Sequence, residues 1–168
     1  MKKTLALAAA AALTTGIVLS GAQAASAADI GTYSSIGTYK VKNVINKTSS
    51  KGYNTGQRLA YCTVGVANTT CTISKTVSAT RTIGVGLDLS RSFVAGKLNI
   101  SSASTVGISV SCTSPKLAKG KSFSAYPRGT HYTYKVTSKT YRDTGKLISS
   151  QTSGALKAFN PDRGIHCL

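Results

Sequence analysis

Two consecutive stretches of the chain alternate apolar and polar residues with opposite phase. Residues 73–93 read ISKTVSATRTIGVGLDLSRSF, and every even position among them is Ser, Thr, Gly or Asp. Residues 94–112 read VAGKLNISSASTVGISVSC, and here most of the apolar residues fall on even positions. A period of two places successive side chains on opposite faces of a β-strand. The two stretches therefore predict two amphipathic strands.

The change of phase at positions 91–92 predicts that these strands form a hairpin. In an antiparallel pair centred there, residue i faces residue 183 − i, so odd positions meet even ones. Such cross-strand pairs stabilise a sheet by about 0.2–1 kcal/mol each. The pairs expected from this register are Ile83 with Ile100, Val85 with Leu98, and Val77 with Val106.

The rest of the chain is typical of short strands separated by turns. Only 15% of the 168 residues are charged, whereas amphipathic helices need many Glu, Lys and Leu at 3.6-residue spacing. Further strands are expected at 59–66, 122–126, 130–141, 146–152 and 155–159, with turns at 127–129 and 142–145. The pattern predicts an all-β protein without a convincing helix. We expect a small disulfide-containing sandwich or a curved antiparallel sheet, with one long hairpin and a flexible N-terminal arm.

The N-terminus is typical of a secretory signal peptide. Two lysines precede a short apolar run, and small residues follow it, so cleavage is expected after Ala24 or Ala27. Residues 1–27 are therefore predicted to be the signal peptide and the mature protein to be secreted. Residues 28–57 are polar and rich in Gly and Ser, which predicts an extended arm with loop structure over 46–56. Residues 58–168 are expected to form the β domain.

Four cysteines in an exported chain predict two disulfides. The predicted hairpin register sets Cys71 opposite Cys112, which would leave Cys62 to pair with Cys167. The alternative pairing is Cys62–Cys71 with Cys112–Cys167. No C-x-x-C pair is present, so a zinc site is not expected.

The composition argues against catalysis. The chain has 21 Lys plus Arg but only four acidic residues, all of them aspartates, and it contains no glutamate. Glycosidases draw on several carboxylates and usually include a glutamate among them. No G-x-S-x-G motif is present, and only His131 and His166 offer a general base. We expect a protein that is not an enzyme and that uses no metal and no cofactor.

The formal net charge of +17 favours acidic partners. The basic residues are scattered singly and in pairs, without the runs of five to eight that mark nucleic-acid patches. Nucleic acid is therefore an unlikely partner. An acidic protein, an anionic surface or a membrane fits the charge better.

The predicted hairpin resembles the membrane-inserting hairpin of aerolysin-type β-pore-forming proteins. Each arm has nearly twenty Ser- and Thr-rich residues, more than the roughly 9–11 that a transmembrane strand needs. The resemblance implies an alternative function in which hairpin 73–112 inserts into a membrane. Arg81 on the apolar face opposes this, because a lipid-facing arginine costs about 2–4 kcal/mol. The residues expected to face lipid are Val77, Ile83, Val85, Leu87, Leu98, Ile100 and Val106.

The mature chain as a whole resembles the B component of secreted umbrella toxin particles. The resemblance rests on the signal peptide, the arm, the four cysteines and the C-terminal segments Tyr132–Val136, Leu156–Phe159 and Gly164–Cys167. It implies a non-catalytic adaptor that bridges secreted protein partners, a lectin-bearing trypsin-like component and a large repeat-containing toxin. It also implies that the arm docks in the partner's protease-like cleft as an added strand. The matching arm residues are Ile36, Tyr39, Lys40, Val41 and Lys42.

Overall fold

The computed structural model describes residues 37–168 and confirms the all-β class. Strands make up most of this part of the chain, and within it one short helix, α1 (Arg91–Leu98), interrupts them. The predicted signal peptide (1–27) lies outside the described residues, as do residues 28–36 of the predicted arm.

One long strand organises the larger of two sheets. β6 (Ser122–Arg142) has 21 residues and pairs antiparallel with other strands along both of its edges. Its partners on one edge are β1 (Thr38–Tyr53) and β2 (Ala60–Thr63). Its partners on the other edge are β7 (Leu147–Thr152) and β8 (Leu156–Cys167). The short β4 (Thr82–Ile83) pairs with the far edge of β8 and completes this six-stranded sheet.

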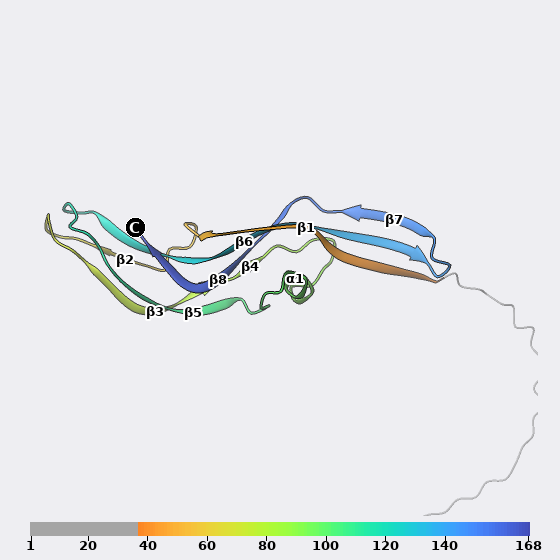
Figure 1. The fold of residues 1–168 in the computed structure, drawn as a ribbon, viewed down its shortest axis with the longest axis horizontal. Coiled ribbons are helices and arrows are strands. Elements are labelled where there is room, and N and C mark those ends of the chain that lie inside the picture. The colour runs from red at the N-terminus through yellow and green to blue at the C-terminus, as the bar shows by residue number, and fades with distance from the viewer. Residues whose placement is uncertain (1–36) are drawn as a thin grey trace, which may run out of the picture. The chain divides into compact units, whose positions relative to one another are not determined.

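The second sheet is the antiparallel pair of β3 (Thr72–Thr80) and β5 (Thr105–Thr113). This pair and α1 lie on the same side of the six-stranded sheet (Figure 1). Two apolar clusters occupy the layer between them and the sheet. The cluster under α1 includes Val44, Ile83, Val94, Leu98, Tyr134 and Val136. The cluster under the β3–β5 pair includes Ile73, Ile108, Val110, Phe123 and Ala125.

The predicted hairpin is present only near its base. Val77 pairs with Ile108 instead of Val106, so the register differs by two residues from the expected one. Beyond Thr80 the two stretches separate, and Ile83 pairs with Ala158 of β8. Each arm is therefore nine residues long instead of nearly twenty. The other two expected pairs, Ile83–Ile100 and Val85–Leu98, are also wrong.

Helix α1 replaces the expected turn of that hairpin because its sequence also satisfies a helical period. The Ser90 side chain caps the helix by accepting a hydrogen bond of 3.2 Å from the Phe93 N–H. Asn99 ends the helix in the left-handed conformation, with a φ of 56°. Val94 and Leu98 are both buried and lie four residues apart, a spacing that fits one face of a helix as well as one face of a strand.

The predicted arm is in fact part of the sheet over residues 38–53. β1 pairs with β6 from Thr38 opposite Arg142 to Tyr53 opposite Arg128. The loop expected at 46–56 is therefore wrong as far as Tyr53. A β-bulge between Ile45 and Thr48 accommodates the polar residues there. The polar sequence of β1 suggests a loop because most of its side chains are exposed, although its backbone is paired.

The turn expected at 127–129 is also wrong, because β6 continues through it. The irregularity lies in β8, where Pro127 pairs with Ile165 and Gly129 pairs with Pro161. A Cβ at Gly129 would overlap the carbonyl oxygen of Asn160. The buried side of β6 changes here from odd positions to even positions. Pro127 and Gly129 therefore lie inside β6 instead of ending it, at the place where its buried positions change from odd to even.

The turn expected at 142–145 is confirmed, and it joins β6 to β7. The Gly145 N–H donates to the Arg142 carbonyl oxygen at 2.8 Å, and Gly145 has a φ of +82°. The Asp143 Oδ2 accepts a hydrogen bond of 3.0 Å from the Gly37 N–H. This contact fixes the start of β1 against the turn.

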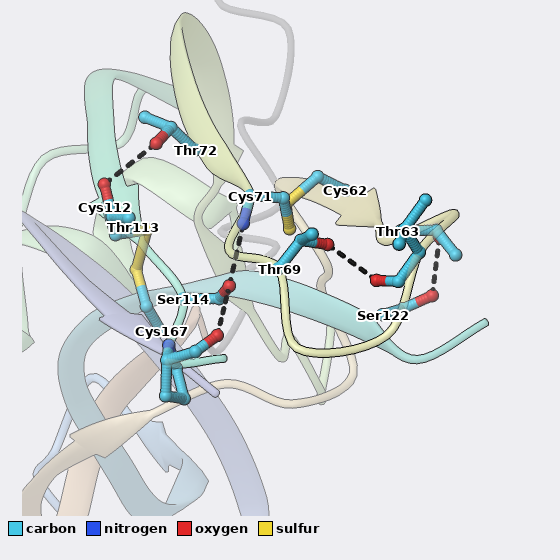
Figure 2. Close-up of a disulfide and its surroundings, with 12 residues drawn as sticks. Cys62, Thr63, Thr69, Cys71, Thr72, Cys112, Thr113, Ser114, Ser122 and Cys167 are labelled. Atoms are coloured by element: carbon cyan, nitrogen blue, oxygen red, sulfur yellow. Dashed lines mark hydrogen bonds between the residues drawn. A yellow bond between two sulfur atoms is a disulfide. The ribbon is translucent and has the colours of Figure 1, made fainter. Parts of the chain in front are cut away.

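The cysteines form Cys62–Cys71 and Cys112–Cys167, the second of the two pairings considered (Figure 2). Cys71 does not face Cys112, since the residue opposite Cys112 is Ile73. Each bridge joins the β3–β5 pair or its flank to a strand of the larger sheet. Native disulfides typically contribute about 2–4 kcal/mol each to stability.

We predict that Gly129→Ala destabilises the fold, because its methyl group has no space beside the Asn160 backbone. The expected loss is about 1–3 kcal/mol in the free energy of unfolding, measured by urea denaturation. Gly107→Ala is the matched control, since Gly107 also lies in a strand and a Cβ there meets nothing within 4 Å. Equal effects of the two substitutions would contradict the close approach of β6 and β8.

We predict that Tyr134→Phe also destabilises the fold. The buried Tyr134 hydroxyl donates to the Gly84 carbonyl oxygen at 2.5 Å, and its removal leaves that oxygen unpaired, at a cost of about 1–3 kcal/mol.

Burial raises the pKa of Tyr134 above its usual value, partly offset by Arg91. The folded form therefore favours the neutral phenol. The stability that Tyr134 contributes is present below the pKa of tyrosine in the unfolded chain, and it is lost as the pH rises through the higher pKa of the folded form. Denaturation curves above pH 10 should accordingly show a steeper loss for the wild type than for Tyr134→Phe.

Candidate functional site

The six-stranded sheet continues past α1 as three strands with little covering on either face (Figure 1). We call this part the β1–β6–β7 extension, and define it as residues 38–44, 136–142 and 147–152. Burial ends at Val44 and Val136, which pack into the cluster under α1. All six residues of β7 are exposed. The extension therefore presents surface that the fold itself does not use.

One face of the extension is apolar. Pairing in register places Tyr39 and Leu147 on either side of Tyr141, and Val41 beside Lys139. Tyr39, Val41 and Leu147 are 48%, 46% and 47% exposed. The rings of Tyr39 and Tyr141 stack with their centroids 5.4 Å apart. We call Tyr39, Val41, Tyr141 and Leu147 the apolar face.

A groove crosses this face between β1 and β6. Its volume is about 270 Å³, and its wall is mainly apolar on the β1 side. The lining residues are Val41, Asn43, Ile45, Thr137, Lys139 and Tyr141. A shallow groove of this kind can hold one or two side chains of another protein.

The arm residues expected to bind a partner divide between the two faces of β1. Tyr39 and Val41 belong to the apolar face, whereas Lys40 and Lys42 point to the opposite side because side chains alternate along a strand. The Lys42 Nζ donates to the Asp88 carbonyl oxygen at 2.9 Å. Ile36, the remaining predicted arm residue, lies outside the described residues.

Tyr141, Leu147 and Ile148 complete this surface, although the sequence does not identify them as partner-binding residues. Their strands look like ordinary alternating strands of a domain. Leu147 and Ile148 are exposed because β7 pairs with the end of β6 beyond any covering element, and Tyr141 is partly exposed there. No local sequence signal distinguishes such a strand from one that is covered.

The chain matches no family model, no curated protein and no solved structure. The resemblances to umbrella toxin components and to aerolysin-type proteins therefore stay predictions. No helix within residues 37–168 is long and apolar enough to cross a membrane. Any function of the extension has to be inferred from its own chemistry.

The residues of the alternative membrane hairpin do not share one surface. Val77 and Val106 pack against the cluster under the β3–β5 pair. Val85 is 50% exposed in the segment after β4. The other four belong to the α1 cluster or pack against it: Ile83, Leu87, Leu98 and Ile100.

The two histidines are both packed against aromatic rings. His131 lies against Phe159 with ring centroids 4.7 Å apart, and His166 stacks on Tyr53 at 4.0 Å. Within residues 37–168, no group of three or more His, Cys, Asp or Glu is placed to hold a metal ion.

A buried arginine supports the chain next to β4. Arg81 is only 7% exposed, and its Nε donates to the Asn160 Oδ1 at 2.6 Å. Its Nη1 donates to the Ala103 carbonyl oxygen at 2.7 Å. Burial, followed by the nearby charge of Arg91, lowers the pKa of Arg81. These bonds tie the segment after α1 to β8, so we assign Arg81 a structural role.

We predict that exposed apolar residues of the extension add little to stability. Val41→Thr should change the free energy of unfolding by less than about 0.5 kcal/mol, because Val41 is almost half exposed. Val136→Thr is the matched control in the same extension, where a hydroxyl would be buried at a cost of about 1–3 kcal/mol. Urea denaturation of both variants tests this. A loss at Val41 as large as that at Val136 would mean that the apolar face is internal to the fold.

Proposed function

We propose that this chain is a secreted, non-enzymatic binding protein that bridges partner proteins in an antibacterial toxin assembly. The observation that carries the proposal is the apolar face of the β1–β6–β7 extension. It sets two tyrosines, a valine and a leucine on a projecting sheet where they stabilise no core. Tyrosine is enriched among residues that dominate binding energy at protein interfaces.

The extension also provides a structural basis for the partner binding expected of the arm. Residues 38–42 are already paired with β6 along one edge, so they would reach a partner as part of a rigid sheet. A preformed surface loses less conformational entropy on binding than a free segment does. We therefore assign partner binding to the apolar face, with any further contribution coming from residues before Thr38.

The alternative function, membrane insertion of hairpin 73–112, has less support. It was based on one continuous amphipathic hairpin, whereas β3 and β5 form arms of nine residues and the segment between them includes α1. Ile83 is part of the larger sheet. No observation on the structure favours this function over protein binding.

We predict that the tagged chain, recovered from the culture fluid of its own host, co-purifies with at least one larger secreted protein at fixed stoichiometry. The double variant Tyr39→Ser/Val41→Thr should recover that protein at least about tenfold less efficiently, because it removes the centre of the apolar face. Val66→Thr is the matched control, since Val66 is 67% exposed but lies between β2 and β3.

The recovered complex should inhibit the growth of susceptible bacteria, whereas the isolated chain should not. Recovery of the wild-type chain alone, as a monomer, would contradict the proposal. Growth inhibition or dye release from liposomes by the isolated chain would favour the pore-forming alternative instead.

A further inference from the structure

The outer edge of β7 is an unfilled position in the six-stranded sheet. β7 and β8 lie end to end along the same edge of β6. β4 pairs with the outer edge of β8, but only through Thr82 and Ile83. Within residues 37–168, no strand continues this row beside β7. The sheet therefore offers room for one more short strand there.

The backbone groups that face this edge can be assigned from one hydrogen bond. The Ser153 N–H donates to the Val136 carbonyl oxygen at 2.9 Å, so Ser153 faces β6. Backbone groups alternate in direction along an antiparallel strand. The N–H and C=O groups of Ser149 and Gln151 therefore also point to β6. Those of Ser150 and Thr152 point to the open edge. The register shift of β7 falls at Ile148, which leaves 149–152 regular.

The outer edge of β1, on the opposite side of the sheet, carries features that oppose pairing along the whole strand. Four lysines lie along β1 and a β-bulge follows Ile45. The Val44 N–H is already bonded to the Asn43 Oδ1 at 2.9 Å. Natural proteins use charges and bulges of this kind to prevent edge-to-edge association. The lysines are Lys40, Lys42, Lys47 and Lys51.

β7 lacks such charges, and its single register shift lies at Ile148, near its start. Its sequence, LISSQT, contains no charged residue and no proline, and every residue is exposed. Leu147 and Ile148 add apolar side chains at one end, 47% and 50% exposed. An exposed, uncharged edge with apolar side chains is a site where another strand can add.

The surroundings of β7 are strongly basic. Within residues 37–168, the turn that leads into β7 carries the acidic side chain of Asp143, which is engaged with the Gly37 N–H. An added strand would lie about 4.8 Å from β7 and about 10 Å from β6, within reach of long basic side chains on its neighbours. The basic residues on the paired part of β6 and in the turn before β7 are Lys139, Arg142 and Lys146.

We propose that β7 accepts an extended, acidic segment of a partner protein as an added antiparallel or parallel strand. Main-chain hydrogen bonds to Ser150 and Thr152 hold the segment, and its carboxylates face the surrounding lysines and arginines. A second copy of this chain is a poorer occupant, because both copies are strongly basic: the full sequence has 21 Lys plus Arg against four acids. This inference rests on the proposed binding function and specifies the chemistry of one partner.

The test uses the full mature chain and two fluorescein-labelled ten-residue peptides with blocked ends. One alternates Glu with Thr and Val, and the other has Lys in place of every Glu. Fluorescence anisotropy should show that the acidic peptide binds at least about tenfold more tightly than the basic one. This preference should weaken when the salt concentration is raised from 50 to 500 mM. The amide resonances of Ser150 and Thr152 should shift on binding.

Ser150→Pro removes one outward N–H and should weaken binding of the acidic peptide at least tenfold. Ser150→Ala keeps that N–H and is the matched control, which should bind as the wild type does. Circular dichroism and the Tm check that the proline variant is folded. Lys139→Glu/Lys146→Glu provides a second test that leaves the backbone unchanged, and it should reverse the preference between the peptides.

Three results would overturn the inference. They are equal binding by folded Ser150→Pro and wild type, equal binding of the two peptides, and self-association of the wild type that Ser150→Pro abolishes. The proposed function is tested separately by the Tyr39→Ser/Val41→Thr variant. A partner that still co-purifies with Ser150→Pro would refute only the proposed role of β7. A wild-type chain without partners would refute the proposed binding function itself.

Discussion

The hydrogen bonding of β6 is the constraint on which the rest of the fold depends. Its backbone runs for 21 residues, and nearly every N–H and C=O group of such a strand needs a partner when it is not in water. Four strands from distant parts of the chain supply those partners. The change of its buried side near Gly129 then determines which end packs under the β3–β5 pair and which end packs under α1.

Alternation in the sequence predicted where strands lie better than it predicted what they pair with. The period of two identifies β3 and β5, but Val77 meets Ile108 and not Val106, because side-chain alternation is equally satisfied by a shift of two residues. Val94 and Leu98 satisfy both periods, and the Ser90 cap decides for a helix. Residues 46–53 of β1 resemble a loop in sequence because most of their side chains are exposed, although their backbone is paired.

The candidate site shows the same division between local and long-range information. Tyr39 and Val41 could be named in advance through a resemblance, although as part of an arm instead of a sheet. Leu147 and Ile148 could not, because their exposure arises only where β7 pairs with β6 beyond every covering element. The contrast between a lysine-bearing edge on β1 and an uncharged edge on β7 likewise appears only when both are known to be edges.

The order of the disulfides has a consequence for how the protein matures. The first cysteine pairs with the second and the third with the fourth, so neither bond crosses the other along the chain. A chain oxidised in the order of its synthesis would meet each native partner before any later thiol competes for it. The second bond joins cysteines 55 residues apart, on either side of β6 and β7, so it closes only after both of those strands have been synthesised. Oxidation in this order would leave little need for an isomerase to correct mispaired intermediates.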